Sequence, residues 1–284
     1  MQVSRVDATL GALVTDVDLR SPDDSTIREI LDAWHQFGVL VFPDQHLTDD
    51  EQISFSKHFG AFERGLNPAS TNKLAHISNL TPEGVVAEPT SLQVRFHEGN
   101  THWHTDSSYK SVGAKASILS ARQVPNEGGE TEWADMRAAW DILDRETQQW
   151  LEDKVAVHSF AYSHSWHGGL ETVGDNIRYL PPVQHPVVRI HPETGRKNLF
   201  VGRHASHIVG EDEYASRALL KKLTSDGAQS PRLWKYTWQS GDIAIWDNRC
   251  VLHRGHRWPL TQARSMVRTT IAGDDPNNAW AMTA

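Results

Sequence analysis

The sequence has a single cysteine, no long hydrophobic run and no cluster of basic residues. One cysteine, Cys250, among 284 residues cannot form an internal disulfide, which fits a reducing cytoplasm. No apolar stretch approaches the roughly 20 residues needed to cross a bilayer, and we see no charged-then-apolar signal segment. The net charge of −8 argues against nucleic acid or an anionic membrane as a partner. We therefore expect a cytoplasmic protein that binds neither.

Linkers, repeats and low-complexity tracts are also absent, so we expect residues 1–284 to form a single domain. β-Sandwiches and barrels reach this length as one unit, and a chain of this size buries about 75% of its surface. The longest polar, glycine-containing stretches are residues 81–90 and 164–176. We expect both to be loops able to close over a site.

Helical periodicity and capping residues predict helices outside a β-rich core. The expected helices lie at residues 25–38, 49–59, 136–142 and 211–223, and the N-caps of the first three are Asp24 or Ser25, Thr48 with Glu51, and Asp135. Strand-like segments lie at residues 39–42, 116–124, 183–190, 199–202 and 234–238. This pattern favours a mostly β fold with flanking helices (α+β), namely a double-stranded β-helix or jelly roll.

The segment Trp103-His104-Thr105-Asp106 carries a histidine and an acid two residues apart. Side chains i and i+2 of an extended segment point to the same side, so His104 and Asp106 are placed to hold one metal ion. Two histidines and one carboxylate on one side of an octahedron, with open positions, form the iron(II) site of non-haem oxygenases. We therefore predict that His104 and Asp106 are metal ligands.

Such a pair also arises by chance. With 16 histidines and 36 acidic residues, roughly two histidine-x-acid matches are expected without function. The second match is His191-Pro192-Glu193, which is followed by Thr194 and Gly195. Proline beside a polar cluster that ends in glycine is typical of a hairpin turn, so we favour the pair at His104 and Asp106.

A third ligand is expected from a distant strand. The apolar, β-prone run at residues 241–255 carries His253 near its end. Beyond it, Arg264 and Arg268 lie four residues apart. A guanidinium group matches a carboxylate with two parallel hydrogen bonds, so these arginines indicate anionic partners. Cys250, in the apolar run, is expected to be a small buried hydrophobe.

Four motifs together resemble one enzyme family. They are His104-x-Asp106, Gly128-Gly129-Glu130-Thr131, Trp246-Asp247-Asn248-Arg249-x-x-x-His253 and Arg264-x-x-x-Arg268. The chain is similar to the iron(II)/α-ketoglutarate dioxygenases that include taurine dioxygenase and 2,4-dichlorophenoxyacetate dioxygenase. The likeness covers nearly the whole chain. It is greatest to the aryloxyalkanoate branch, in residues 135–139, 202–207 and 248–254.

The resemblance implies a set of ligands and cofactors. His104, Asp106 and His253 would hold Fe(II), and three positions would remain for α-ketoglutarate and O2. α-Ketoglutarate would chelate the metal through its keto oxygen and the adjacent carboxylate. The far carboxylate would meet Arg264 and the Thr131 hydroxyl.

Three further roles follow from the resemblance. Trp238 matches a tryptophan beside the cosubstrate. Arg268 matches the position that faces the anionic end of the substrate, and it is also placed to touch α-ketoglutarate. Asn100 matches a substrate contact of the taurine branch. Independently of the resemblance, we expect His204 or His207, from the histidine-rich segment 158–207, to line the pocket. Taken alone, each of these residues also has a simpler interpretation, as a core aromatic or a solvated charge.

The implied reaction is hydroxylation of a small carboxylate-bearing substrate, with succinate and CO2 as coproducts. An aryloxyalkanoate hydroxylated next to its ether oxygen would break down to a phenol and an oxo acid. One alternative is a sulfonate or alkyl sulfate ester, because arginine accepts either anion. Two others are a zinc hydrolase with the same three ligands and a non-catalytic jelly roll that binds a small anion. Family likeness also suggests a homo-oligomer.

Overall fold

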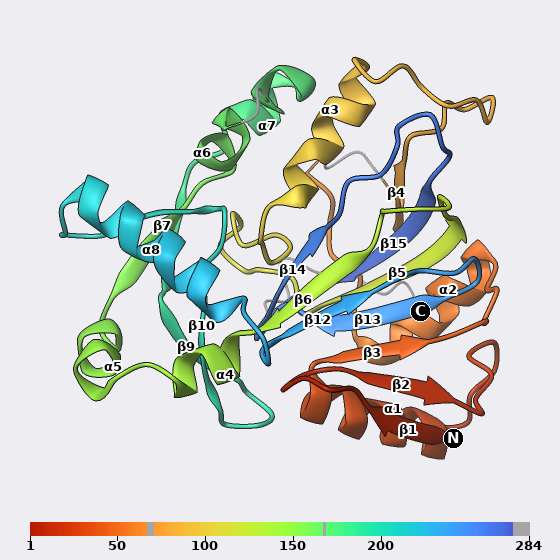
Figure 1. Ribbon diagram of the computed structural model, residues 1–284, viewed down its shortest axis with the longest axis horizontal. Helices are drawn as coiled ribbons and strands as arrows, with labels where there is room; N and C mark the ends of the chain where they lie inside the picture. The colour runs from red at the N-terminus through yellow and green to blue at the C-terminus, as the bar shows by residue number, and fades with distance from the viewer. Residues whose placement is uncertain (67–70, 167–168, 275–284) are drawn as a thin grey trace.

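A seven-stranded sheet forms the centre of the computed structural model, which describes residues 1–66, 71–166 and 169–274 (Figure 1). In spatial order its strands are β1 (Gln2–Arg5), β2 (Ala12–Thr15), β3 (Val39–Phe42), β13 (Ile243–Asp247), β5 (Ala116–Gln123), β15 (Ser265–Ile271) and β4 (Leu74–Ser78). All neighbours pair antiparallel except β2 and β3. A smaller sheet, β12 (Leu233–Tyr236), β6 (Thr131–Asp135) and β14 (Val251–Gly255), faces it.

The inner core lies between these two sheets. Trp133 of β6 is fully buried, and its ring centroid lies 6.0 Å from that of Trp246 on β13. The central strands are apolar on both faces: on β13, Ala244 and Trp246 face this core, whereas Ile243 and Ile245 face outward. Two sheets packed in this way, with helices outside, form the expected jelly roll.

Two helices cover the outer face of the large sheet (Figure 1). In α1 (Asp24–Phe37) the side chains of Ile27, Ile30 and Trp34 pack on that face, as the helical spacing predicted. The N-cap is Asp23, not Asp24 or Ser25, because the Asp23 side chain accepts the N–H of Thr26. Gly38 ends the helix with φ at 73°, a left-handed conformation that glycine adopts without strain.

The capping box of the second helix is confirmed. The Thr48 hydroxyl accepts the N–H of Glu51, and the Glu51 carboxylate accepts the N–H of Thr48. This helix is α2 (Asp49–Ser56), and a 3-10 turn, η1 (Lys57–Phe59), continues it. Phe55 and Phe59 add to the core under the large sheet.

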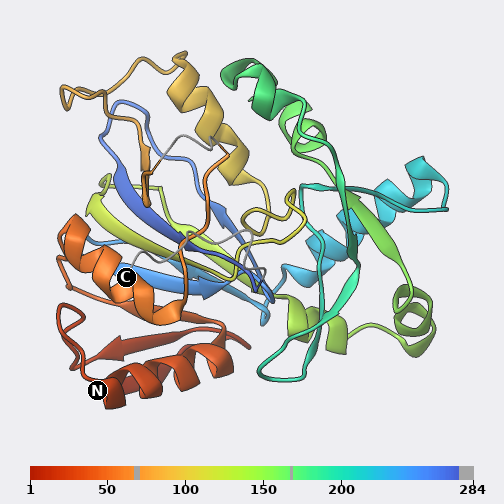
Figure 2. The same ribbon diagram turned by 180° about the vertical axis from the view of Figure 1, so that it is seen from behind.

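A second cluster of strands and helices packs beside the sandwich (Figure 2). Its strands are β7 (Val155–His158), β8 (Val183–Pro186) and β11 (Ala205–Ile208) in one sheet and the hairpin of β9 (Val188–Ile190) with β10 (Lys197–Leu199). Its helices are α4 (Met136–Asp141), α5 (Arg145–Leu151) and α8 (Glu213–Gly227). Asp135 caps α4 as expected. Leu220 and Leu223 of α8 pack against Ala139 and Leu252 in their own apolar core.

Short helices gather at one end of the sandwich. They are α3 (Leu92–Glu98) with η2 (Gly99–Thr101), and α6 (Phe160–Ser165), η3 (Gly169–Thr172) and α7 (Asp175–Arg178). Both views show α3 beside α6 and α7 (Figures 1 and 2), and an Arg95–Glu171 ion pair of 3.0 Å joins α3 to η3. The polar stretch at residues 81–90 leads into α3. Residues 167 and 168 of the other stretch lie outside the described residues.

Several boundaries differ from those expected. Residues 183–190 form two strands, because the pairing partner changes at Val187: its N–H donates to the Lys154 carbonyl beside β7, and its carbonyl accepts the Phe200 N–H beside β10. Of residues 199–202, only Leu199 lies in a strand. The fourth helix runs over Glu213–Gly227 rather than 211–223, after an Asp212 N-cap. Helices α3, α5, α6 and α7 were not predicted. No described helix has both the length and the hydropathy of a membrane span.

Candidate active site

His104 and His253 are brought together by their own backbones. They form an isolated antiparallel bridge in which each N–H donates to the other's carbonyl, at 3.0 Å from His104 and 2.8 Å from His253. Their ring centroids lie 4.1 Å apart, and both side chains are buried. Residues that pair directly in this way have neighbouring side chains. The two backbone hydrogen bonds therefore bring these histidines, which are far apart in the sequence, next to each other in space.

Asp106 completes a group of three. Its Oδ2 lies 3.7 Å from Nε2 of His253, and its Oδ1 lies 4.0 Å from Nε2 of His104. One ligand atom from each residue falls within 4.8 Å of the other two. Nδ1 of His104 lies 2.7 Å from the His102 carbonyl, which leaves Nε2 facing the group.

The local backbone differs from the expected strand. His104 makes only the single bridge, and the chain turns at Asp106, with Ser107 at a left-handed φ of 59°. The expected strand at residues 241–255 is also two strands, β13 and β14, which lie in different sheets. The three side chains are therefore brought together by the turn at Asp106 and the His104–His253 bridge, and not by a shared face of one strand.

Electrostatics at the group favour the forms that bind a metal. Burial, His253 and Arg203 hold the pKa of His104 well below its usual value, and burial lowers the pKa of His253 to about 4. Burial alone would raise the pKa of Asp106, but Arg268, His253 and His104 together bring it below its usual value. At neutral pH the site is thus two neutral imidazoles and a carboxylate, which need lose no proton to bind a cation.

A pocket runs from the two histidines to Arg264. Thr131, Trp246 and Gly255 line it between those ends. Trp238 does not line this pocket. Its indole Nε1–H donates to Oγ1 of Thr131 at 3.0 Å, so Trp238 reaches the pocket through that hydroxyl. Because the Thr131 oxygen accepts this bond, its own hydrogen is free to donate into the pocket.

Arg264 is a buried cation without an acidic partner. Its side chain is 6% exposed, and it donates from Nε and Nη2 to the Gly129 carbonyl at 3.3 and 3.1 Å. No carboxylate among the described residues forms an ion pair with it, and burial lowers its pKa to about 10. A buried charge is costly unless it is paired. An anionic ligand in this pocket would supply that pair.

A second chamber adjoins the other side of His104 and Asp106. Aromatic side chains line it, from Phe96, Tyr109, Phe160, His164 and His204. Arg203 also lines it, is 7% exposed and has a buried Nη1 without a hydrogen-bond partner. Among the described residues no acid forms an ion pair with Arg203. Sequence reasoning did not select Arg203, although it lies in the motif at residues 202–207.

Arg268 and Asn100 border both the pocket and the chamber. Nη1 of Arg268 donates to Oδ1 of Asp106 at 2.7 Å, so this arginine also holds the carboxylate. Asn100 lies in η2, the 3-10 turn before His104. His204 lines the chamber, whereas His207 hydrogen-bonds to the neighbouring Ser206 hydroxyl through Nδ1.

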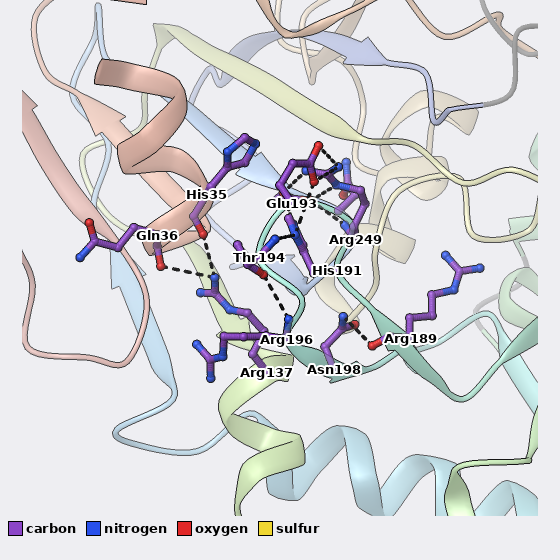
Figure 3. A network of polar contacts seen from close by, with 12 residues as sticks. His35, Gln36, Arg137, Arg189, His191, Glu193, Thr194, Arg196, Asn198 and Arg249 are labelled. Atoms are coloured by element: carbon purple, nitrogen blue, oxygen red, sulfur yellow. Dashed lines mark hydrogen bonds and ion pairs between the residues drawn. The ribbon is translucent and has the colours of Figure 1, made fainter. Parts of the chain in front are cut away.

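The rejected match at His191 belongs to a structural network (Figure 3). As expected, it lies in the turn of a hairpin, between β9 and β10. His191 Nε2 lies 2.9 Å from Oδ2 of Asp247, which also binds Arg249, and Arg249 continues to Glu193. His191, Asp247 and Cys250 do form a second possible metal group among the described residues. The Asp247 carboxylate is already neutralised by Arg249, which disfavours a metal cation there.

Two imidazoles and one carboxylate that could hold a metal ion, at the end of a jelly roll and beside a pocket with a buried arginine, are the kind of ligand set that non-haem iron(II) oxygenases use. The comparisons with known proteins agree. A family profile described as "Taurine catabolism dioxygenase TauD, TfdA family" matches residues 2–270, and the chain belongs to this family. The expected fold, enzyme class and cofactors, namely Fe(II), α-ketoglutarate and O2, are thereby confirmed. A zinc hydrolase and a non-catalytic anion binder do not fit a dioxygenase family.

Individual relatives align over almost the full chain. An (S)-phenoxypropionate/alpha-ketoglutarate-dioxygenase of Sphingobium herbicidovorans is 41% identical and covers 96% of this chain and 95% of its own. An alkylsulfatase of Acinetobacter baylyi is 31% identical, with 99% and 88% covered. The crystal structure of AAD-2 in complex with Mn(II) and N-oxalylglycine superposes with a TM-score of 0.89 at 36% identity, covering 97% of this chain and 99% of that one.

The Asp247 network predicts a stability defect. Asp247→Asn leaves the buried His191 and the largely buried Arg249, which keeps Glu193, beside a neutral amide, and losing hydrogen bonds to a buried carboxylate costs about 1.5–3 kcal/mol of unfolding free energy. Asp141→Asn is the matched control, because the Arg196–Asp141 pair of 2.7 Å is exposed and contributes less than about 1 kcal/mol. Urea unfolding of both variants measures the difference. Equal losses would show that the network does not stabilise the fold.

Proposed function

We propose that this chain oxidises a small aryl-substituted carboxylate, an aryloxyalkanoate, at an Fe(II) ion held by His104, Asp106 and His253. The observation that carries the proposal is the chamber beside these ligands, which combines aromatic walls with the unpaired cation of Arg203. Aromatic rings favour an aryl group by stacking, and a buried guanidinium favours a carboxylate. The relative named as a phenoxypropionate dioxygenase supports the same substrate class.

The three side chains suit a ferrous ion. When bound, Fe(II) supplies, with α-ketoglutarate and O2, the oxidising chemistry of the reaction. The protein contributes position: the His104–His253 backbone bridge fixes the two imidazoles, and Arg268 with Ser117 holds the carboxylate of Asp106. Burial of all three side chains keeps bulk water from the reacting groups.

Arg264 and Thr131 would bind the far carboxylate of α-ketoglutarate. Arg264 is the buried unpaired cation at the end of the pocket, and Thr131 lies between it and the histidines. Trp238 would orient the Thr131 hydroxyl toward the ligand, because its indole N–H occupies an acceptor site on that oxygen. The cosubstrate would thus be held at its far carboxylate by Arg264 and Thr131 and at its other end by the metal site, and the fold fixes the positions of both in advance.

Arg203 and Arg268 would hold the substrate carboxylate. Both line the chamber, as do His104 and Asp106, so an anion between the arginines would place its neighbouring carbon close to the metal. Asn100, at the border of chamber and pocket, would add an amide contact. Hydroxylation of the carbon that bears the ether oxygen gives a hemiacetal, which collapses to a phenol and an oxo acid.

Succinate formation across a substrate series tests the proposal. Phenoxyacetate and both enantiomers of 2-phenoxypropionate should be turned over faster than taurine or an alkyl sulfate. His104→Ala should abolish turnover, whereas the exposed His46→Ala should retain it. Faster turnover of the alkyl sulfate would favour the sulfate ester alternative, which the alkylsulfatase relative supports. If no substrate led to succinate formation from α-ketoglutarate, the proposed dioxygenase activity would be contradicted.

Arg264→Gln tests the cosubstrate pocket. A hydrogen bond to a charged group contributes about 1.5–3 kcal/mol, so the KM for α-ketoglutarate should rise roughly 10- to 100-fold, at 1.4 kcal/mol per factor of ten. The KM for the aryloxyalkanoate should change little. Steady-state kinetics with each substrate varied in turn measures both values, and an unchanged KM for α-ketoglutarate would refute this role.

Arg203→Gln tests the chamber by the opposite pattern. The KM for the aryloxyalkanoate should rise roughly 10- to 100-fold on the same estimate. The KM for α-ketoglutarate should stay near its wild-type value, so Arg203→Gln and Arg264→Gln control for each other. If Arg203→Gln instead raised only the KM for α-ketoglutarate, the division between chamber and pocket would be wrong.

The remaining expectations are a homo-oligomer and a cytoplasmic location. Likeness to the family is the support for the first. The second fits a chain whose one cysteine, Cys250, is 2% exposed within the core between the sheets. Light scattering of the purified protein gives its oligomeric state directly.

A further inference from the structure

Asp106 is the least constrained of the three proposed ligands by backbone pairing. His104 and His253 are fixed by their mutual bridge, whereas Asp106 lies on a turn. Its carboxylate nevertheless receives two hydrogen bonds. Arg268 donates to Oδ1 at 2.7 Å, and the Ser117 hydroxyl donates to Oδ2 at 2.6 Å. The serine has no place in the motifs that identify the family.

Strand register places Ser117 at this position. Ser117 lies near the start of β5, opposite Trp246 in the β5–β13 pairing. Two residues after Trp246, Asn248 begins the turn toward β14, and its side chain lies between Ser117 and the segment that carries Asp106. Ser117 and Asn248 are 0% and 1% exposed, so water does not replace any of their bonds.

Hydrogen-bond chemistry fixes the direction of the bonds in this group. Trp246 Nε1 and the backbone N of Asp106 are donors only, and each lies 3.1 Å from Oδ1 of Asn248. The Asn248 oxygen must therefore face them, and its Nδ2 faces Ser117 and donates to the hydroxyl oxygen at 3.0 Å. The hydroxyl hydrogen is then left for the carboxylate of Asp106, which accepts only. In this series of four hydrogen bonds, each donor atom is thus matched to one acceptor.

We propose that Ser117, oriented by Asn248, is a positioning residue that holds the Asp106 carboxylate in the orientation that binds the metal. The inference rests on the proposed metal site. With one donor on each oxygen, from Ser117 and Arg268, the carboxylate cannot rotate without losing a buried hydrogen bond. Groups that orient a metal ligand in this way typically change metal affinity 10- to 100-fold when removed.

Mn(II) binding to the metal-free protein tests the inference without turnover. Ser117→Ala should raise the Mn(II) dissociation constant about 10- to 100-fold, as measured by electron paramagnetic resonance titration. Ser120→Ala is the matched control. Ser120 is a buried serine on the same strand, but its hydroxyl donates to Gln52 Oε1 at 2.7 Å, away from the site. Its affinity should equal that of the wild type.

Two further measurements separate positioning from a general loss of stability. The metal-free Ser117→Ala and Ser120→Ala proteins should melt at similar temperatures. Ser117→Thr, which keeps the hydroxyl, should bind Mn(II) more tightly than Ser117→Ala. If Ser117→Ala does not fold, Ser117→Cys takes its place, because a thiol fills similar space with a weaker donor, and it should also weaken binding.

The outcomes are distinct. Equal Mn(II) affinity in folded Ser117→Ala, Ser120→Ala and wild-type proteins would overturn the role of Ser117 and leave the proposed function intact. Absence of Mn(II) binding in the wild-type protein would instead overturn the metal site itself, and the proposed function with it.

Discussion

The His104–His253 backbone bridge is the interaction on which the site depends. It joins the turn after η2 to β14 of the small sheet and places the two imidazoles with their ring centroids 4.1 Å apart. Backbone pairing fixes the separation of the two Cβ atoms, so both side chains start from neighbouring positions. The rest of the jelly roll supports this contact. The small sheet positions β14, and the Asp247–Arg249 network holds the turn that leads into β14.

A second constraint is an excess of positive charge, most of it buried, around the three proposed metal ligands. Arg203 and Arg264 are less than one-tenth exposed and have no acidic partner among the described residues, and Arg268 is satisfied only by the ligand Asp106. Such charges lower the stability of the free protein. Their separation, with Arg264 in the pocket and Arg203 in the chamber, would suit the two different anions proposed above, a dicarboxylate cosubstrate and a carboxylate substrate. In this account, buried arginines without acidic partners favour the binding of anionic ligands.

The sequence predicted local features well and tertiary ones unevenly. The α1 spacing, the Thr48–Glu51 box and the Asp135 cap depend on neighbouring residues, and all three were predicted correctly. The pattern predicts one strand in residues 241–255, but the chain forms two, because the turn that divides them depends on bonds of Asp247 to the distant His191 and of Asn248 to Ser117 and Asp106. The unpaired state of Arg203 and Arg264 could not be predicted, since burial and missing partners are properties of the folded chain. Guanidinium chemistry indicated an anionic partner for Arg264 and Arg268, whereas the particular roles of Thr131, Arg264 and Arg268 came from the resemblance and stay predictions.

The most direct test of the central claim is the position of a bound metal. Anomalous scattering from crystals grown with Mn(II) locates the ion without any assumption about activity. We predict one strong peak at bonding distance from Nε2 of His104, Nε2 of His253 and a carboxylate oxygen of Asp106. A peak between His191, Asp247 and Cys250, or one that contacts His104 but not His253, would contradict the account.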